Sequence, residues 1–82
     1  MSKREIQIGK RIKEQMDKEG RKAKWLAKKL SCDASLVYRI YEKGIIPPER
    51  LIDISIVLEV DFFVYYSEYV HQQIQKENNK KR

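Results

Sequence analysis

The chain has few of the residues that build cross-linked or metal-bound proteins. Its 82 residues include one cysteine, one histidine, three glycines and two prolines. A single cysteine excludes a disulfide within the chain, and one cysteine with one distant histidine cannot complete a zinc site. We therefore expect Cys32 to be a small buried apolar residue in a turn, and we expect neither a metal nor a cofactor.

Long apolar runs are also absent. A membrane-spanning helix needs about 18 to 20 apolar residues in succession, and a secretory signal needs an apolar stretch close to the N-terminus. The chain begins Met-Ser-Lys-Arg-Glu-Ile-Gln-Ile-Gly and contains neither feature. The sequence therefore predicts a cytoplasmic protein that makes no membrane contact.

No combination of residues typical of catalysis occurs. The sequence shows no paired carboxylates, no nucleophile spaced to meet a base and no glycine-rich phosphate loop. His71 lacks a catalytic companion, so we expect it on the surface or facing a partner. We predict that the protein is not an enzyme, and no feature indicates a small-molecule ligand.

Positive charge, by contrast, is plentiful and unevenly distributed. The net charge is +6, from 18 basic and 12 acidic residues. Residues 1–44 carry a net +7, residues 45–75 a net −4 and residues 76–82 a net +3. This distribution indicates one surface for a polyanion and another that faces water or a partner. The alternative is that the lysines only make a small helical protein soluble.

Apolar residues recur at helical spacing in five segments, and no segment alternates as a strand would. The sequence therefore predicts an all-α protein. The expected helices cover roughly residues 4–18, 22–30, 34–42, 48–58 and 62–75. We assign residues 4–75 to a single domain and residues 76–82 to a charged C-terminal tail that is expected to fray.

Capping and turn residues mark the ends of these helices. Gly20 ends the first helix, and Gly44 is expected to end the third in a left-handed conformation. Asp33 is expected to cap the third helix with its carboxylate, and Asp61 the fifth. Pro48 can open the fourth helix, because a backbone N–H at that position would have no partner within the helix and proline loses nothing by lacking it.

Residues 22–44 read as two short amphipathic helices joined by a tight polar turn, which is typical of a helix-turn-helix. The residues expected to join the two helices are Leu26, Ala27, Leu30, Val37 and Ile40. The residues left facing outward on the second of them are Asp33, Ala34, Ser35, Tyr38 and Arg39. Arg39 is the strongest candidate reader of DNA because its guanidinium can donate two parallel hydrogen bonds to guanine.

Residues 25–40, Trp-Leu-Ala-Lys-Lys-Leu-Ser-Cys-Asp-Ala-Ser-Leu-Val-Tyr-Arg-Ile, resemble the helix-turn-helix of the Xre/Cro family of phage-repressor-like regulators. That family's consensus runs Leu-Ala-x-x-Leu-Gly-Val-Ser-x-x-x-Ile-x-x-Ile. Residues 8–13 and 48–58 resemble its first and fourth helices. The turn glycine of the family is Ser31 here, which predicts either strain or a slightly different turn.

The resemblance implies a compact, lambda-repressor-like bundle of about five helices that binds double-stranded DNA sequence-specifically. It implies a small transcriptional regulator, usually a dimeric repressor or activator, and we expect a repressor. It places Ala34, Ser35, Tyr38 and Arg39 toward the bases, and Lys22, Lys24 and Lys43 near the DNA backbone. Arg21 can join the phosphate contacts at the start of the second helix, where free N–H groups already favour an anion. Lys28 and Lys29 are expected at the flank or in solvent.

Aromatic residues crowd the start of the last helix. Five of them fall within eight residues: Phe62, Phe63, Tyr65, Tyr66 and Tyr69. One helix of a small domain cannot bury them all, so we expect a homodimer through this helix, with Tyr65, Tyr66 and Tyr69 in the interface. The alternative is a helix that closes the bundle with its tyrosines turned outward.

Other functions stay open. The aromatic helix could make the protein an interaction module, such as an antitoxin-like accessory subunit. An RNA-binding domain has less support, since exposed stacking aromatics do not lie among the basic residues. Trp25 could stack on a base, but a tryptophan beside the core face of a helix more often covers the edge of the core.

Overall fold

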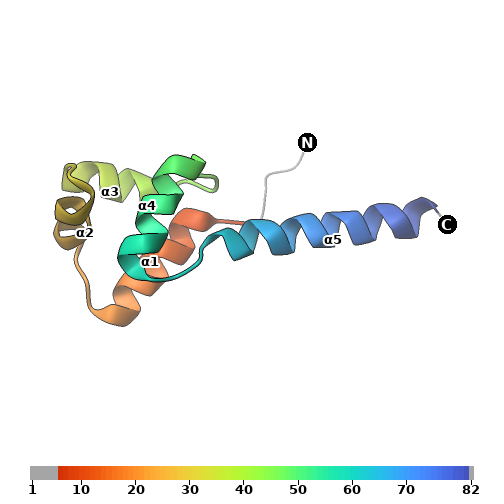
Figure 1. Cartoon of the computed structure of the whole chain (residues 1–82), viewed down its shortest axis with the longest axis horizontal. Helices are drawn as coiled ribbons and strands as arrows, with labels where there is room; N and C mark the ends of the chain where they lie inside the picture. Colours follow the sequence, from red (N-terminus) through yellow and green to blue (C-terminus); the bar gives the residue numbers. More distant parts are fainter. Residues whose placement is uncertain (1–5, 82) are drawn as a thin grey trace.

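The computed structural model describes residues 6–81, with side chains as far as Asn78, and contains five helices and no strand in that range. The helices are α1 (Ile8–Glu19), α2 (Ala23–Leu30), α3 (Ala34–Tyr41), α4 (Pro48–Leu58) and α5 (Phe63–Lys81). Helices α1 to α4 pack together, and α5 extends away from them (Figure 1). The molecule is therefore elongated, with extents of 51 × 24 × 23 Å. The prediction of an all-α chain with five helices is confirmed.

One apolar core holds the first four helices together. The buried residues are Ile6, Ile8, Ile12, Met16, Ala23, Leu26, Ala27, Val37, Ile40, Ile46, Leu51, Ile54, Leu58 and Phe62. Within α1, α3 and α4 they recur every three or four positions, and in α2 they are Ala23 and the adjacent pair Leu26 and Ala27, so each of these four helices turns one stripe inward. Of the five residues expected to join the second and third helices, four are buried and Leu30 is half-buried.

Helix α1 begins later than the sequence predicts. Gln7 has a left-handed backbone (φ 53°) that turns the chain, and Ile6 is buried just before it. Ile8 is the first helical residue, because the start of α1 packs against the segment after α3. There the N–H of Ile8 donates to the carbonyl oxygen of Gly44 at 3.1 Å. The predicted start at residue 4 lies outside the described residues, but residues 6 and 7 are not helical.

Three helices end in a left-handed residue, and only one of these is glycine. Gly20 ends α1 in this way, as predicted, with φ 69°. Ser31 after α2 and Glu59 after α4 adopt the same conformation, each with φ 57°. Gly44 does not, so the expected left-handed stop after α3 is wrong. Helix α3 instead ends at Tyr41, and Lys43 donates its N–H to the carbonyl of Ile40.

The two aspartates expected as caps behave differently. Asp61 accepts the N–H of Phe63 on its Oδ1 atom at 3.0 Å, which confirms its role at the start of α5. Asp33 occupies the N-cap position of α3, but its side chain makes no capping hydrogen bond. The prediction that its carboxylate caps α3 is therefore wrong in this conformation. Pro48 opens α4, as predicted.

The beginning of helix α5 is anchored to the bundle. The Tyr66 hydroxyl accepts the N–H of Ile46 at 3.0 Å and donates to the carbonyl of the same residue at 3.2 Å. Farther along, Val70 and Ile74 are about half exposed. The helix continues to Lys81, whereas the sequence predicted an end near residue 75. The division into a domain and a frayed tail stays a prediction.

Candidate nucleic-acid interface

Helices α2 and α3 are joined by a tight turn and a small apolar contact. Ala27 and Val37 are buried in this joint. At the end of α2, the N–H of Cys32 donates to the carbonyl of Ala27 at 2.9 Å, and the N–H of Ser31 donates to that of Lys28 at 3.2 Å. These two bonds form a Schellman turn, which requires a left-handed residue at Ser31. Glycine adopts this left-handed backbone freely, whereas Ser31 adopts it only with strain.

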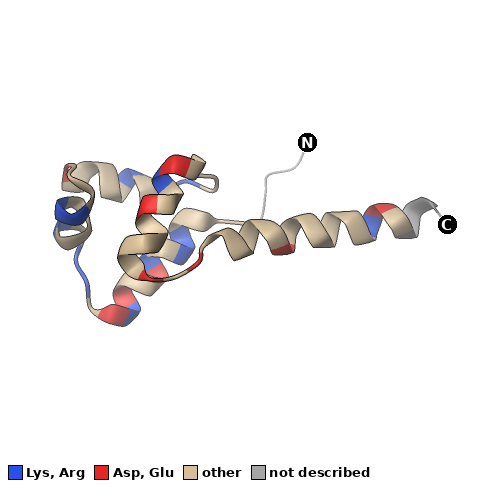
Figure 2. Ribbon diagram, viewed as in Figure 1, with Lys and Arg blue, Asp and Glu red and all other residues tan. Residues whose placement is uncertain are grey.

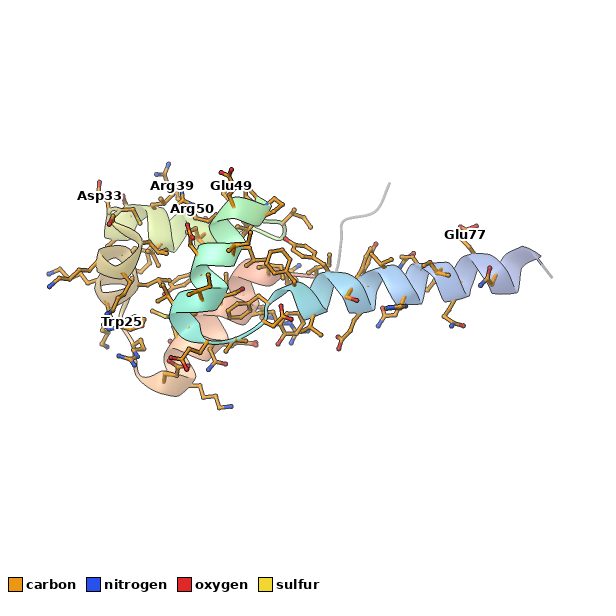
Figure 3. All side chains as sticks on the ribbon, in the orientation of Figure 1. Trp25, Asp33, Arg39, Glu49, Arg50 and Glu77 are labelled. Atoms are coloured by element: carbon orange, nitrogen blue, oxygen red, sulfur yellow. The ribbon has the colours of Figure 1, made fainter. Side chains whose placement is uncertain are left out.

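The outer face of α3 carries most of the residues predicted to face bases. Ser35, Tyr38 and Arg39 are exposed, and Ala34 is half-buried. Figure 3 shows Asp33 and Arg39 pointing outward from the same edge of the molecule. The Arg39 side chain forms no ion pair and no hydrogen bond with the described residues, so its guanidinium is available to a ligand.

Two tyrosines on α3 form a pair with different surroundings. Tyr38 is 59% exposed, and its ring meets that of Tyr41 edge-on at a centroid distance of 6.0 Å. Burial raises the pKa of Tyr41, and the nearby Asp17 and Tyr38 raise it further. The Tyr41 hydroxyl therefore keeps its proton at neutral pH. Tyr41 supports the ring of Tyr38 and leaves Tyr38 as the exposed member.

The residues predicted to contact phosphates are all exposed. They are Arg21, Lys22, Lys24 and Lys43. Arg21, Lys22 and Lys24 lie at the start of α2, which begins without a side-chain cap. Lys43 lies in the segment after α3 and thus flanks the α3 face from the other end. Figure 2 shows basic residues on α2 and acidic residues on α4.

Trp25 holds one of these cations in place. The Arg21 guanidinium carbon lies 4.0 Å from the centre of the Trp25 ring, a cation–π distance. The Arg21 Nε atom is also 3.6 Å from the Glu19 carboxylate. Trp25 itself is half-buried against the core, which agrees with the interpretation that it covers the core edge. Lys29, expected at the flank or in solvent, has its Nζ atom 5.7 Å from the centre of the same ring.

A shallow hollow of about 550 Å³ lies between α2 and the start of α3. It is lined by Lys24, Trp25, Ala27, Lys28, Cys32, Asp33 and Ala34. Two lysines thus face it from α2, and one carboxylate from the start of α3. The sequence did not predict this hollow, because it depends on how the two helices cross. Cys32 is only half-buried here, where the sequence predicted a buried position.

The tyrosines predicted for a dimer interface are occupied within the chain. The Arg11 guanidinium carbon lies 4.7 Å from the centre of the Tyr65 ring, and Tyr66 holds Ile46. Tyr69 is half-buried against the core. These contacts place the start of α5 against the bundle with its tyrosines half-buried rather than turned outward, and the homodimer stays a prediction. The large apolar residues exposed on α5 are Val64, Val70 and Ile74.

The described part of the chain lacks a metal-binding cluster. Residues 6–81 hold no group of three or more His, Cys, Asp or Glu that could bind one metal ion. Over the same range, no helix has both the length and the apolar character needed to cross a bilayer. Comparison of the chain with protein-family models, with curated proteins and with solved structures finds no match in any of the three.

Proposed function

We propose that the chain is a sequence-specific double-stranded DNA-binding protein in which α2 and α3 act as a helix-turn-helix. The observation that carries the proposal is the outer face of α3. It presents Ser35, Tyr38 and an unpaired Arg39 to solvent, while its inner face is fixed to α2 through the core. In this reading the five helices form a lambda-repressor-like bundle of the Xre/Cro type.

In the proposed complex, α3 enters the major groove. Arg39 donates two hydrogen bonds to the O6 and N7 atoms of a guanine, which discriminates against other bases by about 1 to 3 kcal/mol. Tyr38 packs on a thymine methyl or donates to a phosphate, and Ser35 can do either more weakly. Ala34 presents a methyl group, which suits contact with a thymine methyl.

The start of α2 and the segment after α3 bind the DNA backbone in this proposal. Lys22 and Lys24 lie at the N-terminal end of α2, where uncapped backbone N–H groups and the helix dipole add to their attraction for phosphate. Arg21 approaches the same strand with its guanidinium held against Trp25. Lys43 contacts the backbone from the far side of α3. These contacts position α3 and carry no sequence information.

We further propose that the protein acts as a homodimer and as a small transcriptional repressor. Two copies related by a two-fold axis would read the two halves of a palindromic site. Beyond the Tyr66 anchor, α5 offers Val70 and Ile74 to a second copy, and these residues replace the tyrosines as the centre of the proposed contact. Occupying a promoter in this way would exclude other proteins from it.

A second candidate is an interaction module, such as an antitoxin-like accessory subunit. It is favoured by one observation, the half-exposed Val70 and Ile74 on the part of α5 that extends beyond the bundle (Figure 1). In that case α5 would bind a different protein, and DNA binding would be weak or absent.

Selection of bound duplexes from a random pool tests the DNA proposal. The wild-type protein should enrich a defined sequence, and Arg39→Ala should lose the preference at one base pair while still binding duplexes weakly. Arg39→Lys is the matched control, because it keeps the charge and loses the bidentate geometry. It should retain affinity and weaken that preference, because an ammonium group can still donate to guanine but lacks the planar fork of arginine. A wild-type protein that enriches no sequence would overturn the proposal.

A further inference from the structure

Asp33 occupies the N-cap position of α3, but its side chain does not cap the helix. It has the extended backbone of an N-cap (φ −85°, ψ 151°) and precedes α3 directly, yet its carboxylate accepts no hydrogen bond from the helix. Asp61 shows the contrast within the same chain, since its Oδ1 atom accepts the N–H of Phe63 at 3.0 Å. The carboxylate of Asp33 is therefore left for another use.

No neighbour among the described residues uses this carboxylate either. Asp33 is exposed, and no lysine or arginine among residues 6–78 lies within salt-bridge distance of it. It shares the hollow between α2 and α3 with Lys24 and Lys28, but it pairs with neither. Its side chain points away from the molecule along the edge that also carries Arg39 (Figure 3).

A free carboxylate is unfavourable on a surface that meets DNA. It repels phosphates, guanine O6 and thymine O4, all of which are negative or hydrogen-bond acceptors. The groups it can accept from in the major groove are the exocyclic amino groups, cytosine N4 and adenine N6. A carboxylate at this position therefore weakens binding to most sequences and favours those that place an amino group opposite it.

We infer that Asp33 is a specificity-determining residue that accepts a hydrogen bond from the exocyclic amino group of a cytosine or adenine in the major groove. This inference rests on the proposed DNA-binding function. It adds a second read position beside the guanine assigned to Arg39, with the opposite chemistry: Arg39 donates, and Asp33 accepts. It also assigns Asp33 a second effect, the rejection of sites that offer only acceptors there.

Duplex selection with Asp33→Ala and Asp33→Asn tests the inference. Wild-type protein should require cytosine or adenine at one position, and changing that base pair should weaken binding about 5- to 150-fold. Asp33→Ala should bind all bases at that position nearly equally. Asp33→Asn should shift the preference toward adenine, because an amide can pair with both N6 and N7. Asp33→Ser, which can cap α3, controls for effects on the helix.

The outcomes separate the two proposals. If Asp33→Ala selects the same sequence as wild type at every position while Arg39→Ala does not, the role of Asp33 is overturned and the DNA-binding function stands. The same holds if Asp33→Ala strengthens binding to all duplexes alike, because the carboxylate would then act only by repulsion. If wild-type protein shows no sequence preference, the proposed function and this inference fall together. Far-ultraviolet circular dichroism should show unchanged helix content in Asp33→Ala, Asp33→Asn and Asp33→Ser.

Discussion

The backbone N–H of Gly9 donates to the carbonyl oxygen of Lys43 at 2.8 Å, tying the first turn of α1 to the segment after α3. The two backbones meet so closely that a Cβ atom on Gly9 would lie 2.2 Å from the carbonyl oxygen of Ile40. Helix α3 is thus held at its end by α1 as well as along its length by α2. The position of Arg39 depends on both contacts.

Gly9→Ala should therefore destabilise the fold strongly. The added methyl group meets backbone atoms of α3 and its following segment, which cannot move aside as a side chain could. We expect the free energy of unfolding to fall by about 2–4 kcal/mol in urea denaturation. Gly44→Ala is the control, because nothing lies within 4 Å of a Cβ at that position. It should change stability by less than about 0.5 kcal/mol. Equal effects of the two changes would contradict the close contact at Gly9.

Ser31→Gly should stabilise the protein. Ser31 has φ 57° and ψ 47°, a left-handed backbone that costs a side-chain-bearing residue about 1–2 kcal/mol. Glycine avoids that cost but loses more entropy on folding, so the net gain should be about 0.5–1 kcal/mol in thermal or urea unfolding. Gly20→Ser is the reciprocal control, since Gly20 has φ 69° and no nearby atoms. It should lose about 1 kcal/mol. A destabilised Ser31→Gly would indicate a different turn.

Tyr66→Phe should loosen the attachment of α5. The Tyr66 hydroxyl bonds both the N–H and the carbonyl of Ile46, a residue that is only 2% exposed. Removing it leaves two buried backbone groups without a partner, at a cost of about 1–3 kcal/mol. The matched control is Tyr65→Phe. The Tyr65 hydroxyl makes no hydrogen bond with the described residues, and the variant keeps the ring that contacts Arg11. Hydrogen exchange at the Ile46 N–H should quicken in the first variant alone.

The sequence predicts local features of this fold well and long-range ones poorly. The buried positions Leu26, Ala27, Val37 and Ile40 follow from helical spacing alone. The contact at Gly9 does not, because it joins two segments more than thirty residues apart. The sequence predicts a left-handed Gly44, because glycine can adopt that conformation at little cost. Glycine does not have to adopt it, and Gly44 does not. Ser31 shows the converse, because the turn between α2 and α3 requires a left-handed backbone at this position although serine disfavours it.

The candidate surface was predictable to a similar degree. Exposure of Ser35, Tyr38 and Arg39 follows from burial of the opposite face of α3. The stacking of Arg21 on Trp25 had no sequence signal, because Arg21 precedes α2 and helical spacing does not bring it onto the same face as Trp25. The free carboxylate of Asp33 had none. An aspartate before a helix predicts a cap, and only the structure shows that the side chain turns outward instead.

DNA binding should weaken steeply with salt if the basic residues contact phosphates. About four phosphates neutralised per protomer predict a log–log slope on the order of −7 for a dimer. Replacing both Lys22 and Lys24 by alanine should reduce the slope by about half, because two of the four contacts per protomer are lost. The double change of Lys18 and Lys76 to alanine removes equal charge outside α2 and α3 and should leave the slope nearly unchanged. Fluorescence anisotropy at several salt concentrations measures these slopes, and a wild-type slope near zero would exclude the phosphate contacts.

Changing Val70 and Ile74 to glutamate should separate the proposed dimer. Both side chains are about half exposed on the free part of α5, so the fold of one copy does not depend on them. Charge in a contact between two α5 helices would be left without water or a partner, and the mass measured by analytical ultracentrifugation should fall to that of one chain. Affinity for a palindromic duplex should fall too, because each half-site would be bound separately. The same change at Ile52 and Ile56, exposed apolar residues of α4, should alter neither quantity. A wild-type protein that is a single chain at high concentration, yet binds another protein through Val70 and Ile74, would support the interaction module instead.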